Sequence, residues 1–227
     1  MKLKRPLVLA SSSPRRQYLM REAGFEFHVE KPEVDEVYPE ALPVNEVARY
    51  LAAIKAESFR PRMTDHVILT ADTVVILDNT ILNKPSDRDE AIRMLSSLSG
   101  NTHRVMTGVS ILSEEKEENF DETTEVTFEK LSRREIELYI DHFKPYDKAG
   151  SYGAQDCLPP GMNPCSEEEM LFLRSIGKET LIKETITSSA PSVSIVLVKD
   201  IDGSYFNVMG LPIHKIYERL MDFSLAP

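Results

Sequence analysis

Five basic side chains that could bind phosphate and three acidic ones that could bind a metal ion stand mostly at the ends of the helices and strands that the sequence predicts. The basic ones are Arg15, Arg16, Lys55, Lys84 and Lys148, and the acidic ones are Glu36, Asp72 and Asp147. Guanidinium and ammonium groups are common ligands of phosphate in proteins, and carboxylates are common ligands of magnesium. The chemistry that this set indicates is therefore electrostatic stabilisation of a charged phosphate compound, helped by a divalent cation.

The arginine pair stands where a helix is predicted to begin. Leu7 to Ala10 is a short apolar run typical of a buried strand, and Pro14 opens the predicted helix 14–22 with Ser13 as its N-cap. Arg15 and Arg16 fall in the first turn, where the helix dipole and the unpaired N–H groups favour an anion. We expect a phosphate there. The alternative is a solvated arginine pair on a surface helix, because charged surface residues are common.

The overall composition narrows the class of ligand. A formal net charge of -10 in 227 residues argues against broad binding to nucleic acid polymers, but it is compatible with a small polyanion held by local basic groups. No apolar run is long enough to span a membrane, and Met1 to Pro6 lacks the apolar core of a signal peptide, so we expect a cytoplasmic protein. Cys157 and Cys165 lack the companions of a zinc site and are expected to be free thiols, with a local disulfide as the alternative.

The order of predicted elements is typical of an α/β protein. We expect a mixed twisted sheet flanked by helices, arranged as two lobes around a ligand cleft. The predicted strands are 7–10, 25–29, 67–71, 74–77, 80–82, 103–112, 125–128, 193–198 and 205–209. The predicted helices are 14–22, 44–59, one opened by Ser86 and Asp89 and ending at 98, one opened by Ser132 and Glu135 and ending near 143, a short one at 170–176, and a last one from 211 with Ile216, Leu220 and Met221 on one face.

Several common nucleotide-binding and catalytic motifs are missing. There is no G-x-G-x-x-G after a strand, no G-x-x-x-x-G-K-[ST] and no G-x-S-x-G, so neither a dinucleotide fold nor a Walker-type phosphate cradle is supported. The glycine-containing stretch 147–155 reads as a site loop instead, because glycine lets the backbone approach a ligand closely. Tight turns are the alternative explanation of these glycines.

Seven short motifs, taken in order and spacing, resemble the Maf family, and they cover nearly the whole chain apart from the segment after Asp156. They are Ser11-Ser12-Ser13-Pro14-Arg15-Arg16, Asp35-Glu36, Ala71-Asp72-Thr73, Lys84-Pro85, Gly100-Asn101-Thr102-His103, the stretch from Asp147 to Gln155, and Asn207-Val208-Met209-Gly210-Leu211-Pro212. The resemblance implies a house-cleaning nucleoside triphosphate pyrophosphatase with a fold similar to the inosine triphosphate pyrophosphatases. A homodimer would also fit the family.

The glycine loop helps to separate subgroups of that family. Its form Tyr152-Gly153-Ala154-Gln155 looks like the subgroup that acts on dTTP and UTP, rather than the one that acts on 7-methyl-GTP. By the same resemblance Arg15, Thr73 and Gln155 fall at the positions that set base specificity. The side-chain amide of Gln155 could pair with the N3–H and carbonyl edge of a pyrimidine, whereas a satisfied loop amide is the alternative.

The chain departs from the family pattern after this glutamine. We expect a single Maf-like domain over residues 1–227 with an atypical insertion at about 156–192, because about 36 residues separate Asp156 from Val193, far more than a normal connection. The insertion could act as a lid, form an interface, or have no catalytic role.

The predicted reaction is attack of water on the α-phosphorus of dTTP, UTP or a related, possibly modified, pyrimidine triphosphate, which gives the monophosphate and pyrophosphate. Glu36 and Asp72 are expected to hold Mg²⁺ or Mn²⁺, and by the resemblance Asp72 is the proton acceptor. One carboxylate could do both, and a turn aspartate that bonds the backbone is the alternative for Asp72. The expected substrate-binding residues are Ser13, Arg15, Arg16, Lys55, Thr73, Lys84, Lys148 and Gln155.

Two other functions remain open at this point. One is a nucleotide-binding regulator of cell division or septum formation that does not turn its ligand over. The other is an interaction module whose activity lies in residues 156–192, with an idle active site. The intact set of acids and cations argues against the regulator.

Overall fold

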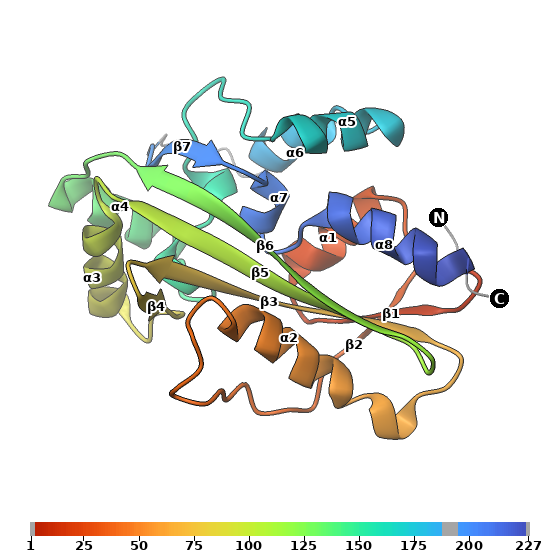
Figure 1. Ribbon diagram of the computed structural model, residues 1–227. Helices are drawn as coiled ribbons and strands as arrows, with labels where there is room; N and C mark the ends of the chain where they lie inside the picture. The colour runs from red at the N-terminus through yellow and green to blue at the C-terminus, as the bar shows by residue number, and fades with distance from the viewer. Residues whose placement is uncertain (1–2, 188–194, 226–227) are drawn as a thin grey trace. The chain divides into compact units, whose positions relative to one another are not determined.

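A mixed seven-stranded sheet forms the centre of the fold, as the sequence predicts (Figure 1). The computed structural model describes residues 3–187 and 195–225. The strand order is β2-β1-β3-β5-β6-β7, with β4 paired to β3 off this path. β1 pairs parallel with β2 and β3, whereas β4 and β7 pair antiparallel with β3 and β6. The strands are β1 (Leu7–Ala10), β2 (His28–Glu30), β3 (Val67–Leu77), β4 (Thr80–Leu82), β5 (Thr102–Leu112), β6 (Glu117–Phe128) and β7 (Val198–Asp202).

Helices and single 3-10 turns connect these strands. The helices are α1 (Pro14–Glu22), α2 (Val47–Glu57), α3 (Arg88–Leu98), α4 (Arg133–Phe143), α5 (Glu167–Ser175), α6 (Leu181–Thr187), α7 (Tyr205–Val208) and α8 (Ile213–Leu225), and the 3-10 turns are η1 (Arg60–Arg62), η2 (Ala149–Ser151) and η3 (Ala154–Asp156). The chain divides into two compact units. The first comprises Met1–Thr73, Met106–Glu122 and Gly210–Pro227, and the second comprises Val74–Val105 and Thr123–Met209.

In the first unit, α2 covers one face of the sheet and α1 and α8 cover the other (Figure 1). Ala56 and the adjoining Phe59 pack against Val8, Ala10 and Ile68 of the strands. The helix lies unusually close to the sheet because β5 has a glycine beneath it. A Cβ at Gly108 would lie 2.3 Å from the carbonyl carbon of Ala48.

In the second unit, an aromatic cluster supports the glycine loop. His103 and Tyr152 share a hydrogen bond of 2.7 Å between Nε2 and the hydroxyl, and the ring of Phe128 stands edge-on to both. The Tyr139 hydroxyl of α4 accepts a hydrogen bond of 2.9 Å from the Gly153 amide. The capping box of Ser132 and Glu135 at the start of α4 is confirmed.

Several predicted boundaries in the middle of the chain were wrong, among them the start of β6, which lies at Glu117 rather than at the predicted 125. β3 runs without a break through Asp72 and Thr73, whereas the sequence predicted separate strands on either side of them. Both polar side chains find partners on other elements, so they do not interrupt the strand. The N-cap of α3 is Asp87, whose side chain accepts a 2.8 Å hydrogen bond from the Glu90 amide, rather than the predicted Ser86.

The C-terminal part differs most from the prediction. The range 205–209, predicted as a strand, contains the helical turn α7, and β7 begins at Val198 and extends to Asp202. The sequence predicted a strand at 193–198 here, and its first two residues, 193 and 194, lie outside the described residues. In α8, Ile216 and Leu220 are buried as predicted, whereas Met221 is 37% exposed.

Candidate active site

A buried lysine joins two carboxylates in the first unit. Lys55, in the last turn of α2, is only 5% exposed. Its Nζ lies 3.0 Å from Oε1 of Glu36, which belongs to the loop before α2, and forms an ion pair with Oδ1 of Asp72 on β3. The Asp72 side chain is 13% exposed and that of Glu36 is 57% exposed. The cluster is therefore a buried cation with one enclosed and one solvent-accessible acid.

The packing of α2 on β3 explains why these groups meet. The hydroxyl of Thr70 donates a hydrogen bond of 2.7 Å to the carbonyl of Ala52, which fixes the helix above the strand. Lys55 lies nearly one turn further along the helix, and Asp72 lies two residues further along the strand. Because alternate residues of a strand share a face, Thr70 and Asp72 both point toward α2. The sequence identified Lys55 and Asp72 as candidates but did not indicate that Lys55 is buried.

Arg16 lies against the opposite face of β3. Its Nη2 donates to the Thr73 hydroxyl at 2.9 Å, its Nη1 to the Ala71 carbonyl at 2.8 Å, and its Nε to the Gly210 carbonyl at 2.7 Å. Thr73 is also hydrogen-bonded to the hydroxyl of Thr107 on β5 at 2.9 Å. Burial lowers the pKa of the Arg16 guanidinium, and the negative charge of Asp72 opposes this shift. Arg16 therefore holds β3 in place immediately before and after Asp72.

The start of α1 has the predicted form. Ser13 is the N-cap, and its hydroxyl accepts a hydrogen bond of 3.5 Å from the Arg16 amide. The first turn holds no acidic residue, and Arg15 is half-buried there. The N-cap prediction is confirmed, while the role of this turn in holding a phosphate stays a prediction.

The second unit carries the other predicted ligands. The Lys148 side chain is 14% exposed, and its Nζ lies 2.8 Å from Oδ1 of Asp147. A Cβ at Gly153 would lie 2.6 Å from Oδ2 of Asp156 and 3.1 Å from Cε of Lys148, so these charged side chains pass directly over the glycine. Oε1 of Gln155 is buried without a hydrogen-bond partner among the residues described. A buried amide oxygen without a partner is costly, which makes it a candidate for binding a ligand donor.

The structure thus sorts the predicted site residues by unit. The first unit holds Ser13, Arg15, Arg16, Glu36, Lys55, Asp72 and Thr73, and the second holds Lys84, Lys148 and Gln155. Lys84 is exposed, two residues after the end of β4. Sequence reasoning missed Thr70 and Gly108, which position α2. A glycine inside a predicted strand is a recognised signal of close backbone approach and could have drawn attention to Gly108.

The two carboxylates beside Lys55 are the candidate ligands of a metal ion. Within residues 3–187 and 195–225, no group of three or more His, Cys, Asp or Glu side chains could hold one. Glu36 and Asp72 nevertheless converge on a single positive charge at Lys55. Magnesium is often held by one or two carboxylates together with waters and substrate phosphates, so this pair fits a metal that arrives with a phosphorylated substrate. Cys157 and Cys165 are free, as expected.

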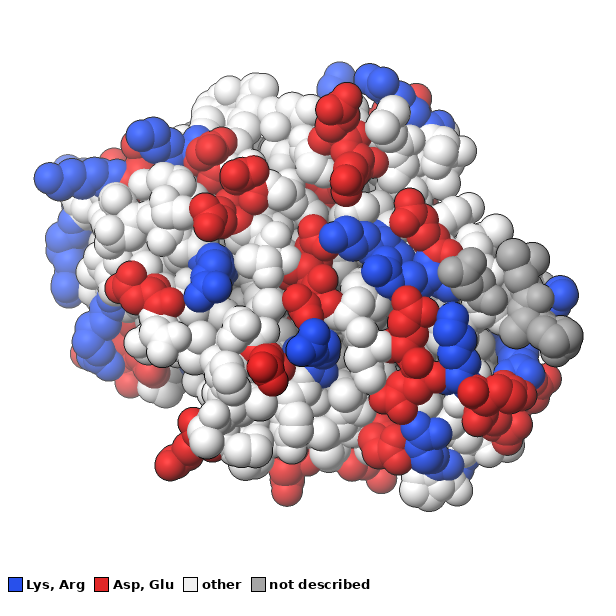
Figure 2. Space-filling model, viewed as in Figure 1, with Lys and Arg blue, Asp and Glu red and all other residues white. Residues whose placement is uncertain are grey.

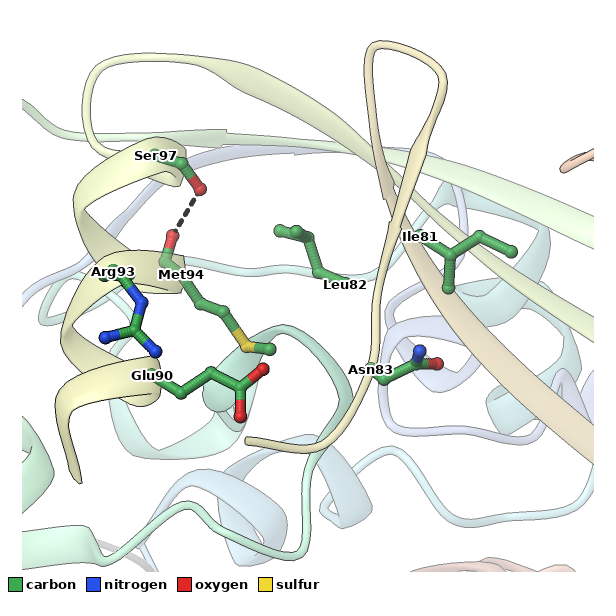
Figure 3. Close-up of a pocket in the computed structure, with 7 residues that line it drawn as sticks. All are labelled: Ile81, Leu82, Asn83, Glu90, Arg93, Met94 and Ser97. Atoms are coloured by element: carbon green, nitrogen blue, oxygen red, sulfur yellow. Dashed lines mark hydrogen bonds between the residues drawn. The ribbon is translucent and has the colours of Figure 1, made fainter. Parts of the chain in front are cut away.

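A separate hollow of about 300 Å³ lies in the second unit between β4 and α3 (Figure 3). The side chains of Leu82 and Met94 extend into this space, and the Ser97 hydroxyl donates to the Met94 carbonyl at 2.7 Å. The lining residues are Ile81, Leu82, Asn83, Glu90, Arg93, Met94 and Ser97. None of them belongs to the predicted site.

The surface charge is mixed. Figure 2 shows acidic and basic side chains interspersed over the face that it draws. Together with the net charge of -10, this pattern favours a small ligand over a polyanionic polymer. Among the described residues, no helix has the length and apolar character needed to cross a membrane.

The comparison with known families identifies the family to which this chain belongs. The model of the family described as Maf-like protein matches residues 6–160. The chain belongs to the Maf family. A relative from Porphyromonas gingivalis, named dTTP/UTP pyrophosphatase, is 40% identical over 223 residues, which cover 96% of this chain and 94% of the relative. Relatives with the same name from Phocaeicola vulgatus and Cytophaga hutchinsonii are 38% and 37% identical over 94% of this chain, covering 94% and 82% of their own lengths. The resemblance seen in the motifs is thereby confirmed.

Proposed function

We propose that this protein is a nucleoside triphosphate pyrophosphatase that hydrolyses dTTP, UTP or related pyrimidine triphosphates to the monophosphate and pyrophosphate. The observation that carries the proposal is the buried Lys55 between Glu36 and Asp72, at positions where the sequence predicted catalytic and metal-binding groups. The name shared by the Maf relatives supports the substrate class. The location of the protein in the cytoplasm and its assembly as a homodimer stay predictions.

In the proposed reaction, Asp72 accepts a proton from the water that attacks the α-phosphorus. Its ion pair with Lys55 fixes the orientation of the carboxylate, and the contacts of Arg16 with Ala71 and Thr73 fix the strand that carries it. A general base must stand within hydrogen-bond reach of its water, so this rigid support contributes directly to the rate.

A divalent cation, Mg²⁺ or Mn²⁺, is part of the proposal. Glu36 and Asp72 would hold it, and when bound it would neutralise negative charge on the triphosphate and on the leaving pyrophosphate. Lys55 contributes positive charge between the same two carboxylates. Removal of divalent ions with a chelator should therefore abolish turnover, and added Mg²⁺ or Mn²⁺ should restore it.

The remaining predicted residues would hold the phosphates and the base. We assign Ser13, Arg15, Lys84 and Lys148 to the phosphates, together with the N–H groups of Arg16 that do not bond Ala71, Thr73 and Gly210. The buried Oε1 of Gln155 supports a role in base reading, because it needs a donor such as the N3–H of uracil or thymine. Arg15 and Thr73 are the other two residues that were predicted to set the specificity for the base.

We also propose that residues 1–227 form one Maf-like domain with an insertion at about 156–192. In support, the family match ends at residue 160, close to the start of the insertion.

The test is a panel of triphosphates incubated with purified protein and Mg²⁺, followed by separation of the products. We expect dTTP and UTP to give dTMP and UMP with pyrophosphate, faster than ATP, GTP, CTP or 7-methyl-GTP. A nucleoside diphosphate with inorganic phosphate would contradict the proposed bond cleavage. Tight binding without any product would contradict the enzyme and support a nucleotide-binding regulator.

A further inference from the structure

The segment after the glycine loop contains a fully buried carboxylate. Glu169 belongs to the first turn of α5, where it forms a capping box with Ser166. Its neighbours Glu167 and Glu168 are exposed, whereas Glu169 is 0% exposed. A buried glutamate requires several hydrogen-bond donors, because an ionised carboxylate loses its hydration on burial.

Three backbone amides and one hydroxyl converge as donors on this carboxylate, and the Cys165 side chain is hydrogen-bonded to it as well. Oε1 accepts hydrogen bonds from the Ser204 hydroxyl at 2.5 Å and the Phe206 amide at 2.9 Å. Oε2 accepts from the amides of Tyr205 at 3.0 Å and Ser166 at 3.0 Å. The Tyr205 and Phe206 amides are the first two of α7, which have no partner within that helical turn. Glu169 therefore ties α5 to the start of α7.

The turn that Glu169 holds is connected to two strands. The Ser204 hydroxyl accepts from the Asn207 amide at 2.9 Å, and the Ser204 amide donates to the Thr124 hydroxyl of β6 at 3.0 Å. The side-chain amide of Asn207 donates to the Val105 carbonyl of β5 at 3.0 Å and to the Thr124 hydroxyl at 2.9 Å. Asn207 is also the first residue of the motif that ends at Pro212.

We infer that Glu169 is a positioning residue: its carboxylate fixes the turn of Ser204 to Asn207, from which the chain continues to the Gly210 carbonyl that accepts from Arg16. Arg16 in turn bonds the residues on either side of Asp72. The effect on activity rests on the proposed function, whereas the effect on the turn does not. The inference gives the part of the segment around Glu169 a role other than that of a lid.

Replacement of Glu169 by glutamine tests this role with little change in size. A glutamine offers one carbonyl oxygen and one NH₂ group, so two of the four donors would face another donor. Those hydrogen bonds would be lost while the side chain stays buried. Glu168→Gln is the matched control, because it removes the same charge from the exposed neighbouring position of the same helical turn.

The experiment compares the full-length protein with both variants by hydrogen exchange and by steady-state kinetics with UTP and Mg²⁺. In Glu169→Gln we expect exchange at residues 204–208 to accelerate at least about tenfold while β1 and α2 keep their protection. We expect kcat to fall about tenfold with KM within about twofold, because displaced catalytic groups slow the reaction without removing substrate contacts. Glu168→Gln should match the wild type in both measurements.

Two results would overturn the inference: faster exchange spread evenly over all peptides, or unchanged protection at residues 204–208. A kcat equal to that of Glu168→Gln would overturn the link to the reaction. If Glu169→Gln does not fold, Ser204→Ala is used instead, because it removes the hydroxyl donor. Faster hydrogen exchange confined to residues 204–208 would then support the inference, and faster exchange spread evenly over all peptides would overturn it. If the wild type cleaves no triphosphate, the proposed function fails, and exchange alone decides whether Glu169 anchors the turn.

Discussion

Asp72 and Thr73 are adjacent in β3, yet their side chains have partners on opposite faces of the sheet. Asp72 pairs with Lys55 of α2, and Thr73 accepts from Arg16 of α1. The catalytic candidate is thus fixed from both sides, by an ion pair on its own face and by backbone and hydroxyl contacts on the other. Such support from neighbouring groups is what a precisely placed general base requires.

At this scale we predict that Asp72→Asn nearly abolishes turnover while the protein stays folded. Asparagine keeps the shape and an acceptor for Lys55 but cannot take up a proton from water, so kcat for UTP should fall by about 10²- to 10⁴-fold. Asp65→Asn is the control, since its side chain is 77% exposed and pairs with Arg5. Circular dichroism checks folding, and wild-type rates in Asp72→Asn would refute the role given to it.

Gln155→Ala should change the choice of base. Loss of the buried amide removes both the donor and the acceptor proposed for the pyrimidine edge, so the ratio of kcat/KM for UTP to that for ATP should fall at least about tenfold. Asn163→Ala removes an exposed amide from the same unit and should leave the ratio unchanged. An unaltered ratio in Gln155→Ala would exclude it from base reading.

Much of the chemistry of the candidate site could be predicted from the residue types in the sequence, but the surroundings of each side chain could not. Glu36, Lys55 and Asp72 were all named as candidates from their type and place in the chain. The burial of Lys55 and its position between two acids depend on how closely α2 approaches β3. That distance is set by contacts between elements far apart in sequence, which no local pattern records.

At the scale of elements, the placement of α2 depends on the absence of a side chain at Gly108. We predict that Gly108→Ala lowers the free energy of unfolding by about 1–3 kcal/mol, because the new methyl group would overlap the backbone of Ala48 and Arg49. It should also reduce kcat, since Lys55 moves with the helix. Urea unfolding and UTP kinetics measure the two effects.

Gly161→Ala is the control for Gly108→Ala. Gly161 has a positive φ of 80°, and a Cβ added to it would have no atom of the described residues within 4 Å, so alanine there causes backbone strain without overlap. Its activity should equal that of the wild type. If Gly108→Ala also keeps full activity, the close approach of α2 is not what positions Lys55.

The predicted elements were most accurate where local signals agreed. The N-cap Ser13 followed by Pro14, and the capping box of Ser132 and Glu135, placed α1 and α4 correctly. The range 205–209 was predicted as the second strand of a hairpin because it follows the turn residues Asp202 and Gly203, but it contains α7 because the Ser204 side chain caps it and Glu169 accepts hydrogen bonds from its first amides. The contact between Glu169 and Tyr205 joins residues 36 positions apart, so the local pattern could not reveal it.

At the scale of the whole molecule, two buried histidines should make the fold sensitive to mild acid. Burial lowers the pKa of His103 to about 4, and burial with the nearby Lys215 and Arg219 lowers that of His214 to about 4. Between pH 6.5 and 4 the unfolded chain takes up protons that the folded protein does not. The free energy of unfolding is therefore highest above pH 6.5 and falls as the pH drops, by about 1.4 kcal/mol per histidine from pH 8 to 5.5.

Urea unfolding at pH 8 and pH 5.5 tests this prediction. His214→Asn should show a smaller loss of stability between the two pH values than the wild type, because it no longer takes up this proton on unfolding. His142→Gln, which changes an exposed histidine of α4, should keep the full pH dependence. Equal pH dependence in the wild type and His214→Asn would contradict the assignment.

The most direct test of the central claim is hydrolysis of UTP with Mg²⁺ in water enriched in oxygen-18, followed by mass analysis of both products. Attack on the α-phosphorus predicts one labelled oxygen in UMP and none in the released pyrophosphate, with product formation at least about 10²-fold slower in Asp72→Asn. Label in pyrophosphate, or formation of UDP and phosphate, would contradict the account.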